Sequence, residues 1–114
     1  MIRNGGQVVY ESKGETLVVR VGGEIDHHSA VSVRTGIDAR IEEERPAKLL
    51  LELSAVDFMD SSGLGLIMGR YALVQKYGGG FAVLDPSAAV LKIIRLAGME
   101  RMITILKTKE KKDA

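Results

Sequence analysis

The sequence predicts a single α/β domain with a mixed central β-sheet flanked by α-helices. Three observations indicate this class. The chain of 114 residues is long enough for one hydrophobic core and too short for two. Near the N-terminus, apolar residues alternate with polar ones, as they do in half-buried strands. After this hairpin-like part, stretches with helical spacing and short apolar runs follow one another, which is typical of parallel strands joined by right-handed helical crossovers.

The first elements are a β-hairpin and a helix. Residues 7–12 and 16–23 alternate apolar and polar side chains around a Lys-Gly-Glu turn, so we expect two paired strands. A polar loop follows. Between Ser29 and Arg45, apolar residues recur every three or four positions, which predicts a helix with one apolar stripe. We expect Ser29 to be its N-cap, and Pro46 to end it.

The second half of the chain alternates strands and helices. A nearly continuous apolar run, typical of a central strand buried on both faces, comes first. A helix and a further strand follow. Pro86 and Ser87 then open a third helix, which Gly98 closes as a C-cap, before a last short strand. The expected ranges are 47–54, 61–77, 81–85, 88–98 and 103–106.

Composition excludes several kinds of site. The chain has no cysteine, so disulfides and thiolate metal sites are ruled out. Its two histidines are adjacent, which is a poor arrangement for a metal site. No apolar run approaches the roughly 20 residues of a membrane span, and the N-terminus lacks the apolar segment of a secretory signal. We therefore expect a cytoplasmic protein that holds no metal or cofactor and does not bind a membrane.

Charge is concentrated at the C-terminus. Residues 107–114 contain four lysines, one Glu and one Asp, whereas the net charge of the whole chain is only +1. The body of the protein is therefore slightly acidic and has no basic stripe, which argues against a nucleic-acid partner. We expect one domain over residues 1–106, followed by a lysine-rich, disordered tail.

The most distinctive stretch is FMDSSGLG, residues 58–65, and it has three interpretations. The first is a dinucleotide-binding turn, because Gly63, Gly65 and Gly69 follow a buried strand and Asp85 lies 20 residues beyond Gly65. Residues intervene between the strand and the first glycine, however, and the chain is too short to supply a second nucleotide-binding half. Glycines also allow a helix to pack closely on a sheet.

The other two interpretations concern the serines. A nucleophilic serine needs a base, and His27 or His28 would be the only imidazole available. Alternatively, Ser61 and Ser62 stand where a loop becomes a helix, so free amides and the helix dipole would favour an added phosphate. That phosphate, beside Asp60, would repel an acidic or apolar partner. Serines that only cap the helix are the simpler explanation of the same residues.

Three segments resemble the STAS-domain family of anti-sigma factor antagonists. FMDSSGLGLIMGRY (58–71) is similar to the phosphorylation segment of that family. GEIDHHSA (23–30) is similar to its second hallmark, and the paired histidines point to the sporulation branch. Residues 85–105 follow the family's pattern of a strand end, a Pro-started helix and a Gly. The resemblance covers nearly the whole chain and implies the STAS fold.

The resemblance implies a regulatory cycle in which the protein is not an enzyme. The unphosphorylated form would bind an anti-sigma factor that is also a serine kinase, and binding would free a sporulation sigma factor. The kinase would then use ATP to phosphorylate Ser61, which weakens the complex, and a PP2C-type phosphatase would restore the active form. A general-stress antagonist with a different kinase, a nucleotide-binding STAS module and a small oxidoreductase-like half domain are the alternatives.

The family comparison also suggests roles for individual residues. Ser61 is the expected phosphate acceptor, and Ser62 is expected to cap or support the helix. Gly63 and Gly65 would give a kinase access to the backbone and let the helix sit close to the sheet. Tyr71 is expected in the core. The candidate partner contacts are Asp26, His27, His28, Asp60, Ser61, Ser62, Gly63 and Arg70.

Overall fold

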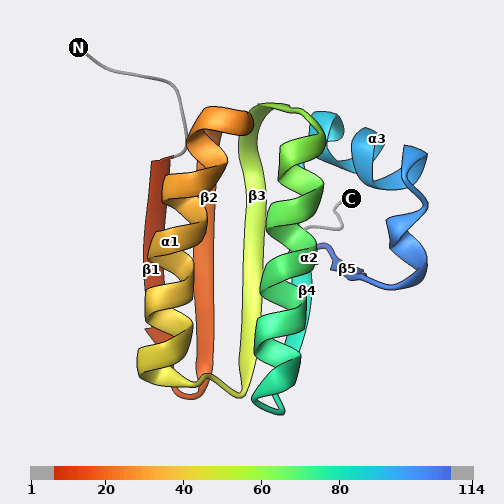
Figure 1. The fold of residues 1–114 in the computed structure, drawn as a ribbon. Coiled ribbons are helices and arrows are strands. Elements are labelled where there is room, and N and C mark those ends of the chain that lie inside the picture. Colours follow the sequence, from red (N-terminus) through yellow and green to blue (C-terminus); the bar gives the residue numbers. More distant parts are fainter. Residues whose placement is uncertain (1–6, 109–114) are drawn as a thin grey trace.

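The computed structural model describes residues 7–108, which form a five-stranded sheet with helices packed against it (Figure 1). The strands lie in the order β1-β2-β3-β4-β5. The first pair is antiparallel and the other three pairs are parallel, so the sheet is mixed, as predicted. Most of the expected tail, from residue 109 on, lies outside the described residues. No helix within residues 7–108 is long and apolar enough to span a bilayer.

The hairpin consists of β1 (Gln7–Lys13) and β2 (Thr16–Ile25). Gly14 sits in the turn with φ of 61°, a left-handed conformation that glycine adopts without a steric penalty. The hairpin was therefore predicted correctly, although β2 continues two residues beyond the expected end.

The parallel strands are β3 (Lys48–Met59), β4 (Gly80–Leu84) and β5 (Thr104–Leu106). The prediction ended β3 at residue 54, which was too early. The strand continues because its far half still pairs with β2, up to Ile25 opposite Met59. The pairing of β4 with β3 stops at Leu84, opposite Glu52, so this far half of β3 extends beyond β4.

The helices are α1 (His27–Glu44), α2 (Ser61–Lys76) and α3 (Ala88–Leu96), with a 3-10 turn, η1 (Met99–Arg101), after them. Helices α1 and α2 lie side by side on one face of the sheet, and α3 lies beyond the end of β4 (Figure 1). The N-cap of α3 is Ser87, whose backbone amide donates to Leu53 O of β3 at 3.1 Å. Gly98 follows α3 with φ of 72°, as expected of a residue that ends a helix.

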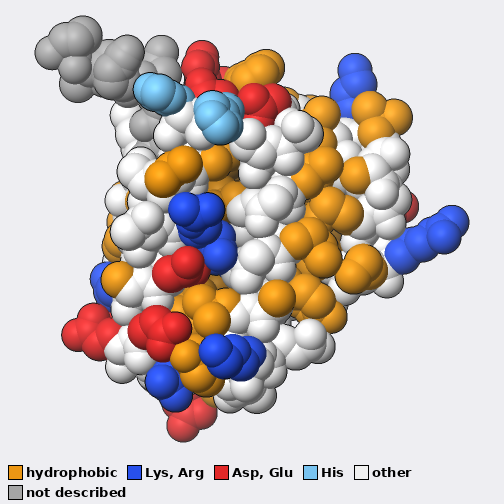
Figure 2. Space-filling model, viewed as in Figure 1, with side chains coloured by type: hydrophobic (Ala, Val, Ile, Leu, Met, Phe, Trp, Pro, Cys, Tyr) orange, Lys and Arg blue, Asp and Glu red, His pale blue; other side chains and the backbone are white. Residues whose placement is uncertain are grey.

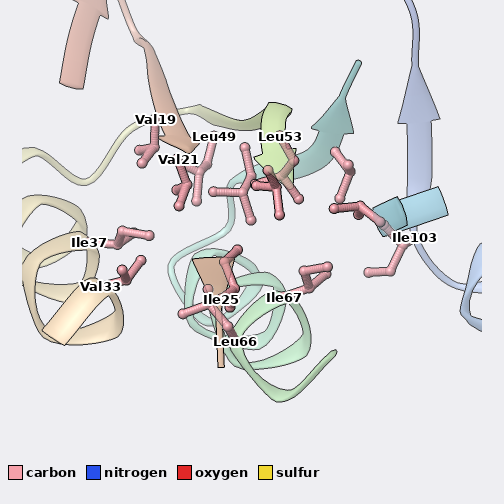
Figure 3. Close-up of a cluster of buried hydrophobic side chains, with 14 of the residues drawn as sticks. Val19, Val21, Ile25, Val33, Ile37, Leu49, Leu53, Leu66, Ile67 and Ile103 are labelled. Carbon is pink, nitrogen blue, oxygen red and sulfur yellow. The ribbon is translucent and has the colours of Figure 1, made fainter. Parts of the chain in front are cut away.

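The hydrophobic core lies between the sheet and the helices α1 and α2 (Figure 3). Alternate residues of β2 and β3 point toward the helices, and the predicted stripe of α1 meets them. Each fully buried Leu or Ile contributes about 1.5–3 kcal/mol through removal of apolar surface from water. The fully buried side chains include Leu17, Val19, Ile25, Val33, Ile37, Ile41, Leu49, Leu51, Leu53 and Ile67.

Helix α2 packs tightly on the sheet at its first turn because Gly63 has no side chain. A Cβ at this position would overlap the side chain of Met59, the last residue of β3, which is 4% exposed. Gly65 differs, since a Cβ there would meet nothing within 4 Å. Of these two glycines, therefore, only Gly63 is required by the packing.

We expect Gly63→Ala to lower the free energy of unfolding by about 1–3 kcal/mol, because the added methyl group must displace Met59 from a packed position. Gly65→Ala is the matched control. It adds the same methyl group in the same helix without a clash, and its higher helix propensity should leave stability unchanged or raise it by up to about 1 kcal/mol. Urea denaturation followed by circular dichroism measures both. Equal losses in the two variants would contradict this packing argument.

Candidate functional site

Two helix N-termini meet at one edge of the sheet. Strands β2 and β3 are parallel neighbours whose last residues, Ile25 and Met59, lie opposite each other. Asp26 and Asp60 come next in the chain, and each is the N-cap of the helix that follows. The amide of Asp60 donates to Ile25 O at 3.1 Å, which joins the cap of α2 to the residue that precedes the cap of α1. The structure thus brings the loop that contains Asp26 next to the start of the helix that contains Ser61.

The N-terminus of α1 is closed by a reciprocal pair of hydrogen bonds. Asp26 Oδ1 accepts from the amides of His28 and Ser29, both at 2.9 Å, and the amide of Asp26 donates to Ser29 Oγ at 3.0 Å. The Ser29 hydroxyl also donates to Glu24 O at 2.8 Å. The prediction of Ser29 as N-cap was wrong. Ser29 holds the third helical position of a capping box, and Asp26 is the cap.

These hydrogen bonds affect the acidity of the cap. The amide of Ser29 stabilises the carboxylate of Asp26 and so lowers its pKa, and the amide of His28 acts in the same direction. His27 and His28 occupy the first turn of α1, and both side chains are exposed. Within residues 7–108, no three or more potential metal ligands gather at one place.

Helix α2 is capped by Asp60, whose Oδ1 accepts from the amide of Ser62 at 2.8 Å. Of the two roles expected of Ser62, the cap is therefore taken by Asp60, and local support of the helix stays a prediction. Ser62 is half-buried, whereas Ser61, the first residue of the helix, is exposed. No hydrogen bond found among residues 7–108 involves the Ser61 hydroxyl, because the preceding aspartate already provides the cap. Ser61 is thus an accessible hydroxyl at the positive end of a helix.

Arg70 does not lie on the surface, contrary to the expectation of a surface contact. It is 6% exposed and reaches from α2 to Asp38 of α1, with Nε 2.8 Å from Oδ1 and Nη2 3.4 Å from Oδ2. Nη1 donates to Leu66 O at 3.3 Å. Burial lowers the pKa of the Arg70 guanidinium, the nearby Asp38 raises it and Arg34 lowers it. Arg70 therefore contributes to helix packing. Tyr71 is half-buried against the core.

Sequence reasoning missed two further side chains at this end of the sheet. Asp57 and Phe58 are exposed on the far half of β3, Phe58 by 49%. They went unnoticed because the strand was expected to end before them. The sequence offered no clean signal, because Val56 and Met59 are buried with two exposed residues between them, so the period of two is broken where the pairing with β2 shifts register. Phe58 and Asp57 thus add an exposed aromatic ring and a carboxylate to the end of β3 that precedes Ser61.

The structure does not favour the two other interpretations of FMDSSGLG. Gly63, Gly65 and Gly69 all lie inside α2, rather than in a turn that could cradle a pyrophosphate. Asp85, the expected ribose ligand, has a left-handed backbone with φ of 48°, and its carboxylate accepts from the amide and hydroxyl of Thr108 at 2.8 and 2.6 Å. A nucleophilic serine would need a hydrogen bond from its hydroxyl to a histidine, and no such bond is found among the described residues.

Comparisons with known proteins agree with this geometry. A STAS domain family model matches residues 7–112. The chain is 37% identical over 99 residues to the anti-sigma F factor antagonist of Paenibacillus polymyxa, covering 87% of this chain and 85% of that protein. It resembles the solved anti-sigma factor antagonist SpoIIAA in its unphosphorylated form, with 29% identity, a TM-score of 0.77 and coverage of 93% and 90% of the two chains.

A second solved structure, the Bacillus cell fate determinant SpoIIAA in its phosphorylated form, is also similar. Its TM-score is 0.71 at 28% identity, and 93% of each chain is covered. The predicted STAS fold, with its mixed sheet and flanking helices, is confirmed by these matches and by the architecture itself.

The Asp26 cap leads to a prediction about pH. Because its pKa is lower in the folded than in the unfolded protein, its stabilisation is complete above the ordinary aspartate pKa of about 3.9. It is lost as the pH falls through the folded value. Asp26→Asn keeps a capping oxygen but cannot titrate, so we expect the wild type to lose more stability than this variant on acidification.

Urea denaturation at a series of pH values from about 6 down to about 3 measures this difference. Asp57→Asn removes one exposed carboxylate that caps no helix, and controls for the change of net charge. Parallel stability curves for the wild type and Asp26→Asn would show that the capping hydrogen bonds do not distinguish the folded carboxylate from the unfolded one.

Proposed function

This chain belongs to the STAS domain family, and we propose that it is an anti-sigma factor antagonist switched off by phosphorylation of Ser61. In the unphosphorylated state it binds an anti-sigma factor that is also a serine kinase, and binding releases the sigma factor that the kinase holds. A PP2C-type phosphatase removes the phosphate and restores binding. The pathway is a cytoplasmic, sporulation-type control of transcription, and the chain is the substrate of the kinase rather than a catalyst.

The exposed and unengaged hydroxyl of Ser61 carries this proposal. Ser61 is the first residue of α2 and follows the cap, Asp60. Its hydroxyl forms no hydrogen bond with another residue in the range 7–108. The neighbouring cap at Asp26 places His27 and His28 at the same edge of the sheet. A kinase that approaches Ser61 therefore meets both loops at once, which supports these residues as contacts.

In the proposed reaction, ATP is the only source of the phosphoryl group that is transferred to Ser61. The Ser61 oxygen attacks the γ-phosphorus of ATP bound to the kinase, and the bond from that phosphorus to the β,γ-bridging oxygen breaks. ADP leaves, and a base on the kinase takes the hydroxyl proton. The antagonist supplies the acceptor and its position, and no cofactor of its own.

The position of Ser61 allows a large change of charge with little strain on the fold. A phosphate adds about −1.5 to −2 charges, and the N-terminus of α2 favours an anion there. The fold therefore tolerates the modification, while the surface that a partner meets becomes more acidic than Asp60 alone makes it. The names of the SpoIIAA structures, one unphosphorylated and one phosphorylated, are in keeping with such a switch in a relative.

The direct test is incubation of the protein with ATP and the anti-sigma factor kinase of its source organism, followed by intact and tryptic mass spectrometry. We expect one added phosphate in the wild type and in Ser62→Ala, and none in Ser61→Ala, because only Ser61 is exposed at the start of the helix. Circular dichroism controls for folding of both variants. Phosphate on Ser62 in the wild type, or on neither serine, would contradict the assignment.

A further inference from the structure

A groove between the N-terminal halves of α1 and α2 lies beside the proposed phosphorylation site. It has a volume of about 310 Å³. Helix α1 contributes His27, Val31 and Arg34 to its walls, and α2 contributes Ser62 and Gly65. A side chain at position 65 would meet nothing within 4 Å, so the glycine keeps this wall low. The groove is therefore open to a side chain of another protein.

The groove has an unbalanced positive charge at one end. Arg34 is close enough to Arg70 to lower the pKa of the Arg70 guanidinium. Among residues 7–108, Asp38 is the one carboxylate that forms an ion pair with either of these two arginines. Arg70 takes that carboxylate. Arg34 is exposed and has no ion pair or hydrogen bond with another residue in the range 7–108. Figure 2 shows basic side chains and an acidic neighbour over α1, amid uncharged surface.

Part of the groove wall is apolar where it reaches the surface. Val31 is 50% exposed, so it offers apolar surface to another chain. An exposed apolar side chain next to an unneutralised guanidinium is complementary to a partner that presents an apolar side chain next to a carboxylate. The guanidinium pairs well with a carboxylate, because its planar donors meet both oxygens.

Resting on the proposed function, we propose that this groove receives an acidic side chain of the anti-sigma factor, which pairs with Arg34 while an adjacent apolar side chain packs on Val31. Arg34 is then a specificity-determining contact for the unphosphorylated state. The partner chemistry is complementary to the groove in charge and in polarity.

The same contact gives the phosphate a direct way to weaken the complex. Ser61 does not itself line the groove, but it precedes Ser62, which does, so a phosphate on Ser61 adds its negative charge close to the groove. A phosphate there repels an entering carboxylate, and it also competes with that carboxylate for the guanidinium of Arg34. Both effects lower the affinity for the same partner group, which explains the sign of the switch without a change of fold.

Isothermal titration calorimetry with the anti-sigma factor kinase tests this through a double-mutant cycle of Arg34→Gln and Ser61→Asp. We expect each single substitution to weaken binding about tenfold. The double variant should bind about as weakly as Ser61→Asp alone, because both changes remove one contact. Arg101→Gln is the matched control, since it removes an exposed arginine on η1 away from the groove and should leave the affinity unchanged.

The outcomes separate this inference from the function on which it rests. If the wild type binds the kinase and Arg34→Gln binds equally well, or if the two losses multiply in the double variant, the groove contact is overturned and the antagonist function stands. If the wild type does not bind, both fail. A second test combines the charge-reversed Arg34→Glu with kinase variants in which each acidic residue in turn is replaced by Lys. Restored binding in one combination would identify the partner carboxylate. A complete set of such variants without restored binding would contradict the proposal.

Discussion

The parallel pairing of β2 with β3 is the constraint on which the rest of the structure depends. The two strands stay paired to Ile25 and Met59 in spite of two register shifts along the way. Because each strand is followed at once by an aspartate, two capped helices start side by side. A slip of one residue would turn the side chains of a strand to the opposite face and would separate the caps. The site is thus a consequence of strand register before it is a matter of individual residues.

The helices that start at this edge are held in place by two different kinds of interaction. Apolar side chains such as Ile37 and Ile67 bury the inner faces of α1 and α2 against the sheet. Between the helices, the buried guanidinium of Arg70 pairs with Asp38, whose side chain is 33% exposed, and a buried charge is costly unless its partner stays with it. Separation of the helices would break this pair, so the two N-termini are tied to one relative position.

Periodicity in the sequence was enough to predict the order and type of every strand and α-helix within residues 7–108, because burial of apolar side chains decides both, although it did not predict the short 3-10 turn η1. It failed where two local solutions were chemically equivalent. Asp26 and Ser29 both suit an N-cap, and only the reciprocal hydrogen bonds show which one caps. Arg70 was misplaced because its partner, Asp38, lies 32 residues away and on another helix. Pairings of this kind, like the groove at Arg34, exist only once the helices have been placed.

The cap at Asp60 has a consequence for how a kinase would recognise Ser61 under the proposed function. Many modification sites are short linear segments that an enzyme binds in an extended form, but Ser61 is already part of a helix whose first turn is closed by Asp60 and whose next residues pack against Met59. A peptide with the same letters would lack the neighbouring loop from β2 and the orientation of the hydroxyl. Under the proposed function, recognition of Ser61 is therefore conformational, and a kinase is expected not to phosphorylate a misfolded or truncated copy of the chain.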